Sequence, residues 1–376
     1  MNRDNLLLVA NSEQDANMLY AVGMFVPDPF IFFSVGGKPH IVLNDLEIDR
    51  GRREARRCRV LPLSRYFNQL RQQGNAAPTL AQALPLILRR FRLRRVVVPS
   101  SFPLALARQL QKAKIKVDIR PGSFFPAREI KTAEEVKKIS AALVMAEVGL
   151  SEAMQVLRRA KIGKGGKLIY QNGPLTSERL RSVIDVAILQ AGGLASNTIV
   201  AGGAQACDPH ERGFGALRAN QPIVLDVFPR SQKTGYFGDI TRTVVRGRAT
   251  EAVRKLYATV ARGQQLAFEK IRSGARALEI HQTVQKFFEG RGYKTGKQKG
   301  RMAGFFHGTG HGLGLEIHEP PRVGVSSTDT LKKGQIVTVE PGLYYHGMGG
   351  VRIEDVVLVT AEGVRNLTRF EKVLEL

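Results

Sequence analysis

The sequence predicts an α+β protein in two domains, a smaller α/β domain over residues 1–126 and a larger domain over residues 127–376 that contains an internal duplication. Three observations predict this arrangement. The chain has 376 residues, which is more than one typical hydrophobic core organises. Short apolar runs alternate with helical patterns up to Pro126, where the pattern breaks. Beyond that proline, the order of two helices followed by paired strands occurs twice.

The first domain is expected to hold a mixed sheet, because its short apolar runs alternate with amphipathic segments. The strands are predicted at LLLVA, FIFFSV, HIVLN, RRVVVPS and IKVDI, and the helices at LAQALPLILRRF and FPLALARQLQKA. Its acids, histidines and cysteine form no pairing that suggests catalysis. A scaffold, an oligomer contact or a substrate gate is therefore the expected role of this domain.

The first half of the second domain opens with a capping box, in which Glu135 follows Thr132 at the required spacing. This box predicts a helix that runs to about Ala160. A second helix is expected from about Ser177 to Gln190, and it ends before a pair of glycines. Strands then follow at NTIVAGG, PIVLDVFP and GYFGDITRTVV.

The second half repeats this order. Thr250 is expected to cap a helix that ends near Gly274, and a further helix is expected from about Leu278 to Gly290. Strands are predicted at QIVTVE and VRIEDVVLVT. The two halves are thus predicted to be structural duplicates.

Each half carries two carboxylates in strand-like runs, and these acids are candidate metal ligands. Asp226 and Asp239 lie on a hairpin through RSQKTGYFG, and Glu340 and Glu354 lie on strands of the second half. If the halves face each other, the four acids share one pocket with His311, from the glycine-rich loop FFHGTGHGLGLEIHEPP. Four acids brought together require compensating cations. The pattern therefore predicts two divalent ions that share carboxylates and activate water for amide hydrolysis.

Three further histidines are candidates for contact with a substrate. His318 is interpreted as a donor to the substrate carbonyl, the alternative being a histidine packed beside the prolines that follow. His210, in the polar loop CDPHERG, either reaches the pocket or is an exposed loop histidine. His307 lies shortly before His311, but the glycines around them argue against a helix that would align the two side chains.

Arg352 is a candidate for binding carboxylates. It lies two residues before Glu354 in a predicted strand, so both side chains are expected on one face. Its guanidinium would bind a bridging carboxylate, a substrate carboxylate or a partner in a structural ion pair, and spacing alone leaves these three open.

The composition excludes several classes of protein. With 43% hydrophobic and 24% charged residues, the chain is globular rather than disordered. No apolar run approaches the length of a transmembrane helix, and the N-terminal apolar patch is too short for a signal peptide. Only Cys58 and Cys207 are present, so a disulfide scaffold is excluded and a reducing cytoplasm is expected.

The formal net charge of +24 is unusual. It would suit a nucleic-acid partner, yet the basic clusters lack the interleaved aromatic residues that stack on bases. Specific nucleic-acid binding is therefore not expected, whereas non-specific association with polyanions is. The clusters are Arg50, Arg52, Arg53, Arg56, Arg57 and Arg59; Arg89, Arg90, Arg92, Arg94 and Arg95; and Lys294, Lys297, Lys299 and Arg301.

The joint motif set resembles that of the M24-type pita-bread metallopeptidases: aminopeptidase P, prolidase and, more distantly, methionine aminopeptidase. The resemblance is carried by HGTGHGLGLEIHEPP, VEPGLYY and GVRIED, with the two aspartates ahead of them. It is strong from about Arg128 onward, and DANMLYAVGMF is similar to the creatinase-type N-terminal domain of the Xaa-Pro branch. The resemblance implies a C-terminal pita-bread domain with pseudo-twofold symmetry, and hydrolysis of Xaa-Pro bonds by an aminopeptidase or a dipeptidase.

For the site, the resemblance implies a dinuclear centre, manganese first with cobalt or zinc as alternatives, held by Asp226, Asp239, His311, Glu340 and Glu354. Asp239 and Glu354 would bridge the ions, and Glu340 would also be the general base. His318 would steady the tetrahedral intermediate, and His210 would contact the substrate near the scissile bond. His307 would line the pocket, and Arg352 would support Glu354.

The expected partners are a peptide with proline at its second position and a second copy of the chain, as a homodimer, with no membrane. Two other functions stay open. One is a non-catalytic pita-bread module that binds protein or nucleic acid, which the basic charge would suit. The other is a metal-free creatinase-like C–N hydrolase, which would have lost the acidic ligands that this chain retains.

Overall fold

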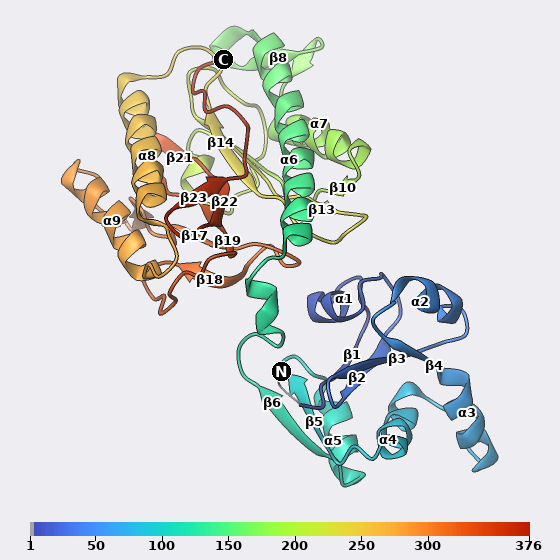
Figure 1. The fold of residues 1–376 in the computed structure, drawn as a ribbon. Helices are drawn as coiled ribbons and strands as arrows, with labels where there is room; N and C mark the ends of the chain where they lie inside the picture. Colours follow the sequence, from blue (N-terminus) through green and yellow to red (C-terminus); the bar gives the residue numbers. More distant parts are fainter. Residues whose placement is uncertain (1–3) are drawn as a thin grey trace. The chain divides into compact units, whose positions relative to one another are not determined.

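The computed structural model describes residues 4–376, and the chain divides into two compact units. One unit ends at Pro126, and the other covers Ala127–Leu376. Figure 1 colours the chain along its sequence, so the first unit is blue to cyan and the second runs from green to red.

The first unit combines a mixed sheet and a separate strand pair with helices. Its strands are β1 Leu7–Ala10, β2 Phe30–Val35, β3 Lys38–Leu43, β4 Arg59–Pro62, β5 Arg95–Pro99 and β6 Lys116–Arg120, and its helices are α1 Ala16–Val22, α2 Ile48–Glu54, α3 Leu63–Gln72, α4 Leu80–Arg90 and α5 Leu104–Lys112. The sheet order is β1-β2-β3-β4, antiparallel except for the parallel pair β3 and β4. Strands β5 and β6 pair parallel. The mixed sheet expected from the sequence is present.

Strand β2 is apolar on both faces because each face is covered. Phe33 packs with Leu84 of α4 in one core cluster, and Phe32 packs with Met18 of α1 in another. Successive residues of a strand point to opposite faces, so a strand covered on both sides requires a continuous apolar run. The segment FIFFSV meets that requirement.

The first half of the second unit begins with α6 (Ala133–Arg159), which packs on α7 (Ser177–Gln190). The hydroxyl of Thr132 accepts the backbone N–H of Glu135, and the Glu135 carboxylate accepts the backbone N–H of Thr132. The predicted capping box is therefore confirmed. An antiparallel sheet follows, formed by β11 Ile199–Gly202, β12 Ile223–Val227 and β14 Ile240–Val244.

The second half repeats the order. Helix α8 (Glu251–Lys270) packs on α9 (Ala277–Gly290), and Thr250 caps α8 as predicted. Helix α8 ends before the predicted Gly274, because Ile271 leaves it in an extended conformation with a buried side chain. The sheet order is β18-β17-β19-β22-β23, with bounds Glu319–Val323, Gly310–Gly312, Ile336–Val339, Asp355–Val359 and Val364–Asn366. Figure 1 shows the two helix pairs on opposite sides of the strands.

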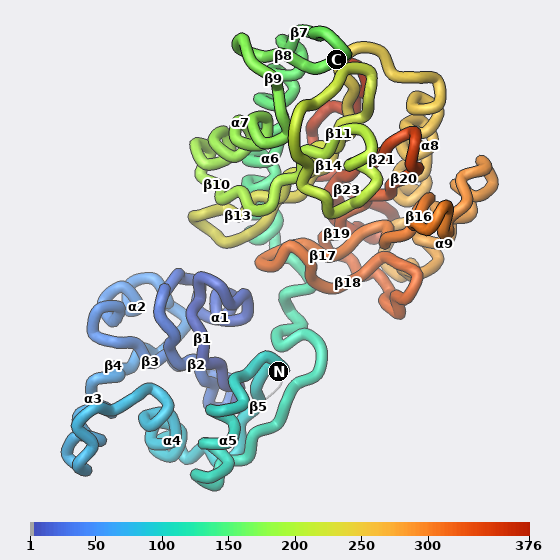
Figure 2. Tube along the Cα trace, turned by 180° about the vertical axis from the view of Figure 1, so that it is seen from behind, coloured from blue at the N-terminus to red at the C-terminus, as the bar shows by residue number. Residues whose placement is uncertain are grey.

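Two predictions of the sequence need correction. The run VRIEDVVLVT is not one strand, because the chain changes partner within it: β21 (Gly349–Arg352) pairs with β20 (Gly342–Tyr345), and β22 pairs with β19. Glu354 lies at this change of partner. The segment around His311 is not a loop throughout, because β17 pairs with both β18 and β19. Figure 2 shows β17 and β18 side by side.

Shorter elements complete the second unit. Strands β7, β8 and β9 form one small sheet, β10 pairs with β13, and β15 forms a hairpin with β16. Their bounds are β7 Lys161–Ile162, β8 Leu168–Tyr170, β9 Gly173–Pro174, β10 Gly193–Leu194, β13 Arg230–Ser231, β15 Gly296–Gln298 and β16 Arg301–Ala303, and the 3-10 turns are η1 Pro126–Glu129, η2 Lys164–Gly166 and η3 Gln205–Cys207.

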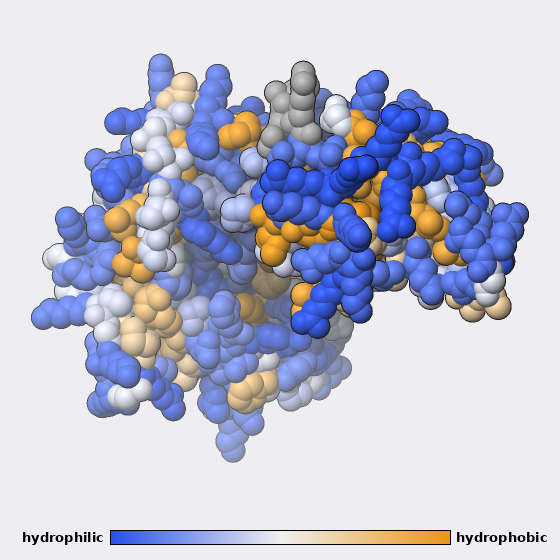
Figure 3. Space-filling view, turned by 90° about the horizontal axis from the view of Figure 1, so that it is seen from below, coloured by the Kyte–Doolittle hydropathy of each residue, from blue (hydrophilic) through white to orange (hydrophobic). Residues whose placement is uncertain are grey.

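Helix α6 also has the length and composition of a membrane span, and within residues 4–376 it is the one helix that does. Half of its apolar window is buried, with Ile139, Leu143 and Leu150 almost fully enclosed. This burial against α7 identifies α6 as a core helix of the unit. Hydrophilic residues cover most of the face drawn in Figure 3, and hydrophobic residues gather in smaller patches.

Candidate metal centre and active site

Three candidate ligands lie within reach of a single ion. One ligand atom from each of Asp239, His311 and Glu354 lies within 4.8 Å of the others, and all three residues are buried. Asp239 directly precedes β14, His311 is the middle residue of β17, and Glu354 lies between β21 and β22. Side chains that are far apart in the sequence thus converge on one point.

The other two candidate acids line the same cavity. Glu340 follows β19, and its Oε1 lies 3.2 Å from His311 Nε2. Asp226 lies on β12, and its buried Oδ1 has no hydrogen-bond partner among residues 4–376. A buried carboxylate oxygen without a partner is costly unless a cation compensates it, so this donor set fits a metal. The cavity, of about 1340 Å³, is lined by all five residues and also by His210, His307, His318 and Arg352.

The orientation of His311 suits a metal ligand. Its Nδ1 lies 3.1 Å from the carbonyl oxygen of Gly312. A carbonyl oxygen only accepts, so Nδ1 carries the proton in this hydrogen bond. The lone pair of Nε2 then faces the acids, at 3.7 Å from Asp239 Oδ2 and 3.2 Å from Glu340 Oε1. A backbone acceptor on one ring nitrogen commonly fixes the tautomer of a metal-binding histidine.

Close backbone packing explains the glycines on either side of His311. A Cβ atom at Gly310 would lie 1.9 Å from the carbonyl oxygen of Thr338, and one at Gly312 would lie 2.2 Å from that of Pro320. No side chain fits at either distance. The glycine-rich motif therefore allows β17 to lie between β18 and β19 with the imidazole directed at the acids.

Two of the four acids, Asp239 and Glu354, have raised pKa values, whereas the pKa of Glu340 is lowered to about 2, against the effect of burial, by its hydrogen bond with His311 and by the nearby His311, His307 and Arg352. Burial raises the pKa of Asp239 well above its usual value, and the charges of Glu354, Asp226 and Glu340 add to this effect. Burial also raises the pKa of Glu354 well above its usual value, with Glu340 and Asp226 contributing. Bound divalent cations would lower these raised pKa values, because they stabilise the charged carboxylates and take the place of the protons.

Arg352 contacts a candidate ligand directly. Its Nη2 donates to Asp226 Oδ2 at 2.7 Å, and its Nη1 donates to the Tyr344 hydroxyl at 2.9 Å. Its Nε lies 3.4 Å from the Thr241 hydroxyl, which donates to Glu354 Oε2 at 2.7 Å. The buried guanidinium thus fits an ion pair with Asp226 better than the binding of a substrate carboxylate. The expectation that Arg352 supports Glu354 stays a prediction, and the link through Thr241 is compatible with it.

The other three candidate histidines occupy different parts of the cavity, which His281 also lines. The ring of His318 lies edge-on to that of His311, 4.3 Å between centroids, and burial followed by the charge of His311 lowers the His318 pKa to about 4. His307 Nε2 lies 2.9 Å from the Tyr344 hydroxyl, and burial is the main cause that lowers the His307 pKa to about 4. His210 is exposed on its loop. All three line the same cavity.

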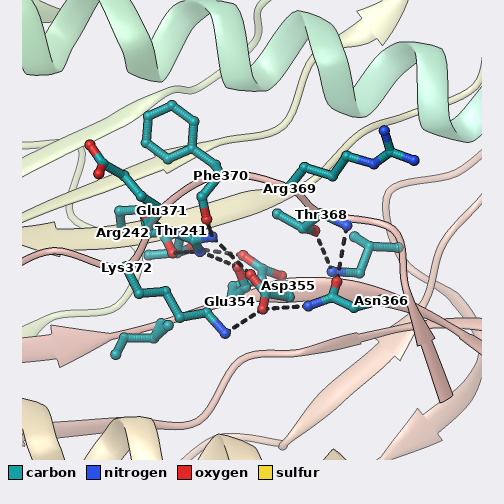
Figure 4. Close-up of polar contacts among 12 residues, drawn as sticks. Thr241, Arg242, Glu354, Asp355, Asn366, Thr368, Arg369, Phe370, Glu371 and Lys372 are labelled. Carbon is teal, nitrogen blue, oxygen red and sulfur yellow. Dashed lines mark hydrogen bonds and ion pairs between the residues drawn. The ribbon is translucent and has the colours of Figure 1, made fainter.

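A second set of polar residues holds the segment that carries Glu354. Arg242 Nη1 donates to the Glu354 carbonyl oxygen at 2.6 Å, and Arg242 Nη2 donates to Asp355 Oδ1 at 2.9 Å. Lys372 and Asn366 bind the other oxygen of Asp355, at 2.6 and 2.9 Å (Figure 4). These residues were not among the candidates predicted from the sequence. The aspartate that directly follows Glu354 in the GVRIED run is a signal that could have indicated them.

Comparison with known proteins supplies the family. Residues 137–361, more than half of the chain, match the metallopeptidase family M24. The chain belongs to this family. The M24 chain is 32% identical over 253 residues to the Xaa-Pro dipeptidase of Pyrococcus furiosus, an alignment that covers 66% of this chain and 65% of that relative. The match thus spans slightly less than two thirds of the relative's length.

Two solved structures share the fold of this M24 chain. An Xaa-Pro dipeptidase from Bacillus anthracis aligns with a TM-score of 0.82 at 22% identity, covering 99% of this chain and 95% of that one. An X-Pro aminopeptidase from Thermotoga maritima aligns with a TM-score of 0.82 at 20% identity, covering 99% and 97%. The second unit therefore has the pita-bread fold that the motif set predicted.

Proposed function

We propose that this chain is a dinuclear metal-dependent exopeptidase that cleaves the bond on the N-terminal side of proline, as an Xaa-Pro aminopeptidase or dipeptidase. The observation that carries the proposal is the convergence of four acids and one imidazole, from both duplicated halves, on one cavity. The names of its relatives, an Xaa-Pro dipeptidase and an X-Pro aminopeptidase, support this substrate class.

Asp226, Asp239, His311, Glu340 and Glu354 would hold the two ions, and Asp239 and Glu354 would be the ligands shared between them. Carboxylates with one imidazole suit manganese, which we propose first, and also cobalt or zinc. Such ions, when bound, lower the pKa of water and polarise the scissile carbonyl. Arg352 holds Asp226 in place, and Thr241 holds Glu354.

Glu340 is proposed to move the proton. Its side chain is 19% exposed, against 6% for Asp239, so it is the more accessible to water in the cavity. It would accept a proton from the attacking water and return it to the proline nitrogen, which carries no hydrogen of its own in the peptide. His318, neutral because its pKa is lowered to about 4, would donate a hydrogen bond to the carbonyl oxygen as negative charge develops there. His210 and His307 would contact the substrate.

The first unit is proposed to be a creatinase-type N-terminal domain, and the working protein a homodimer. The mixed sheet of the first unit and the DANMLYAVGMF segment support the domain assignment. Cys58 and Cys207 are both free, which is compatible with the proposed reducing cytoplasm.

The test compares an Xaa-Pro dipeptide, an Xaa-Pro tripeptide and the same tripeptide with alanine in place of proline. Each is assayed with manganese, cobalt or zinc, and with a chelator. We expect cleavage of proline peptides only when metal is present, and the choice between dipeptide and tripeptide names the subclass. Cleavage that survives chelation, or equal cleavage of the alanine peptide, would contradict the proposal. Steep salt-dependent binding of nucleic acid without peptidase activity would favour a binding module.

A further inference from the structure

A buried cluster of opposite charges lies outside the proposed ligand set, and we call it the Glu319 cluster: Arg128, Lys131 and Glu319. Arg128 Nη2 donates to Glu319 Oε2 at 2.7 Å, and Lys131 Nζ donates to Glu319 Oε1. The side chains of Lys131 and Glu319 are 2% and 4% exposed, and that of Arg128 is 10% exposed. Both oxygens of one interior carboxylate are therefore held by cations.

The cluster is joined to the candidate active site through the backbone. Glu319 directly follows His318, opens β18 and pairs with Gly312, which directly follows His311. A Cβ atom at Gly314 would lie 2.4 Å from Glu319 Oε1, so the intervening loop lies against the carboxylate itself. Fixing Glu319 thus fixes the peptide that carries the His318 imidazole.

The two cations come from the segment that precedes α6. The backbone N–H of Lys131 donates to the Gly334 carbonyl oxygen at 2.8 Å, and Lys131 Nζ donates to the Arg128 carbonyl oxygen at 2.5 Å. The capping box of α6 begins at the next residue, Thr132. The segment that carries both cations is therefore held in place by backbone hydrogen bonds and by the capped start of α6, as residues that position a catalytic group must be.

The side chain of His318 has little direct support from the described residues. Its side chain is exposed to the cavity and makes no hydrogen bond within residues 4–376, and its described neighbour is the edge-on ring of His311. We infer that Arg128 and Lys131 are positioning residues that act through Glu319 to place His318 against the substrate carbonyl. The inference rests on the proposed peptidase function.

The test is a double-mutant cycle between Lys131→Met and His318→Ala. Misplacing a catalytic group by about 1 Å can cost ~10²-fold, so Lys131→Met should lower kcat by roughly 10- to 100-fold. KM and the content of bound manganese should stay within about twofold of the parent chain. In the His318→Ala background, where the imidazole is already absent, the same lysine change should lower kcat by less than about threefold.

Two further variants separate positioning from folding. Lys131→Arg keeps the charge and should restore most of kcat. Leu157 is fully buried in the core of the first half. Leu157→Ala should lower Tm at least as much as Lys131→Met does, but without lowering kcat. If Lys131→Met does not fold, Arg128→Lys, which keeps charge but loses the planar fork, enters the same cycle.

Equal losses of kcat in both backgrounds would overturn the inference, because they would show an effect independent of His318. So would a loss of kcat in Leu157→Ala that matches the loss in Lys131→Met at equal Tm. If the parent chain cleaves no Xaa-Pro peptide, the proposed function itself is wrong. That result differs from equal losses of kcat in the two backgrounds, which would leave the proposed function intact and refute only the positioning role.

Discussion

Replacing Asp239 by asparagine is expected to abolish metal uptake and turnover while making the metal-free protein more stable. A ligand oxygen of Asp239 lies within 4.8 Å of one of Glu354. Two unit charges at this separation repel by about 3.5 kcal/mol at an effective dielectric constant of about 20. Burial and this repulsion raise the pKa of Asp239, so near neutral pH the folded chain bears either the repulsion or the cost of taking up a proton, and asparagine removes both. We therefore expect asparagine to raise the free energy of unfolding by about 1–3 kcal/mol.

The assay is thermal unfolding of the parent chain and Asp239→Asn, with a chelator and with manganese. For a unit of this size each kcal/mol changes Tm by about 2–4 °C, so the metal-free variant should unfold roughly 2–12 °C higher than the metal-free parent. Manganese at about 100 times its Kd should stabilise the parent by about 2.7 kcal/mol and the variant not at all. Elemental analysis and kcat then check that the variant neither binds metal nor turns over.

Asp355→Asn is the matched control. Asp355 is as buried as its neighbour Glu354, but it contacts Arg242 at 2.9 Å and Lys372 at 2.6 Å. Removing its charge leaves the buried Arg242 guanidinium with carbonyl acceptors but without a carboxylate to balance its charge, and should cost about 3–5 kcal/mol. The two aspartate-to-asparagine changes are thus expected to shift the metal-free Tm in opposite directions. A fall in Tm for both would refute the claim that repulsion among the acids dominates at Asp239.

Three other predictions follow from the site and the surface. His318→Ala should lower kcat by about 10²–10³-fold, as expected for loss of a transition-state donor, with metal content unchanged by elemental analysis. Gly310→Ala should lower the free energy of unfolding by about 1–3 kcal/mol or more and weaken metal uptake, because its Cβ would lie 1.9 Å from the Thr338 carbonyl oxygen. Denaturant titration measures the loss, and Gly363→Ala, whose Cβ would meet nothing within 4 Å, is the control. The net charge of +24 should make kcat/KM for acidic Xaa-Pro peptides fall as ionic strength rises, and a flat salt dependence would exclude electrostatic steering.

The parts of the structure that depend on local signals could be predicted from the sequence. The capping box at Thr132 and Glu135 gives the start of α6, and Thr250 gives the start of α8. Asp226 and Glu340 stood out because each follows apolar residues in a strand-like run, where an unpaired charge is unexpected. The same element order occurs twice, with two of the acids in each half, and this repetition predicted that the two halves share one cavity.

Features that depend on partners distant in the sequence could not be predicted. The contact of Lys131 with Glu319 joins residues separated by 188 positions, and that of Arg242 with Asp355 spans 113, so neither leaves a local pattern. The strand break at Glu354 falls inside a stretch that is buried on both sides of the break, so burial does not mark it. Only the change of pairing partner, which is a tertiary property, determines where that strand ends.

The position of Arg128 and Lys131 also decides where the second unit can be separated from the first. A chain shortened to begin at Ala127 keeps both cations beside Glu319, whereas one shortened to begin at Ala133, the first residue of α6, leaves that carboxylate buried without either. Both pieces would contain every proposed ligand and every helix from α6 onward. The minimal catalytic piece therefore starts ahead of its first long helix, in a stretch that otherwise looks like a dispensable linker.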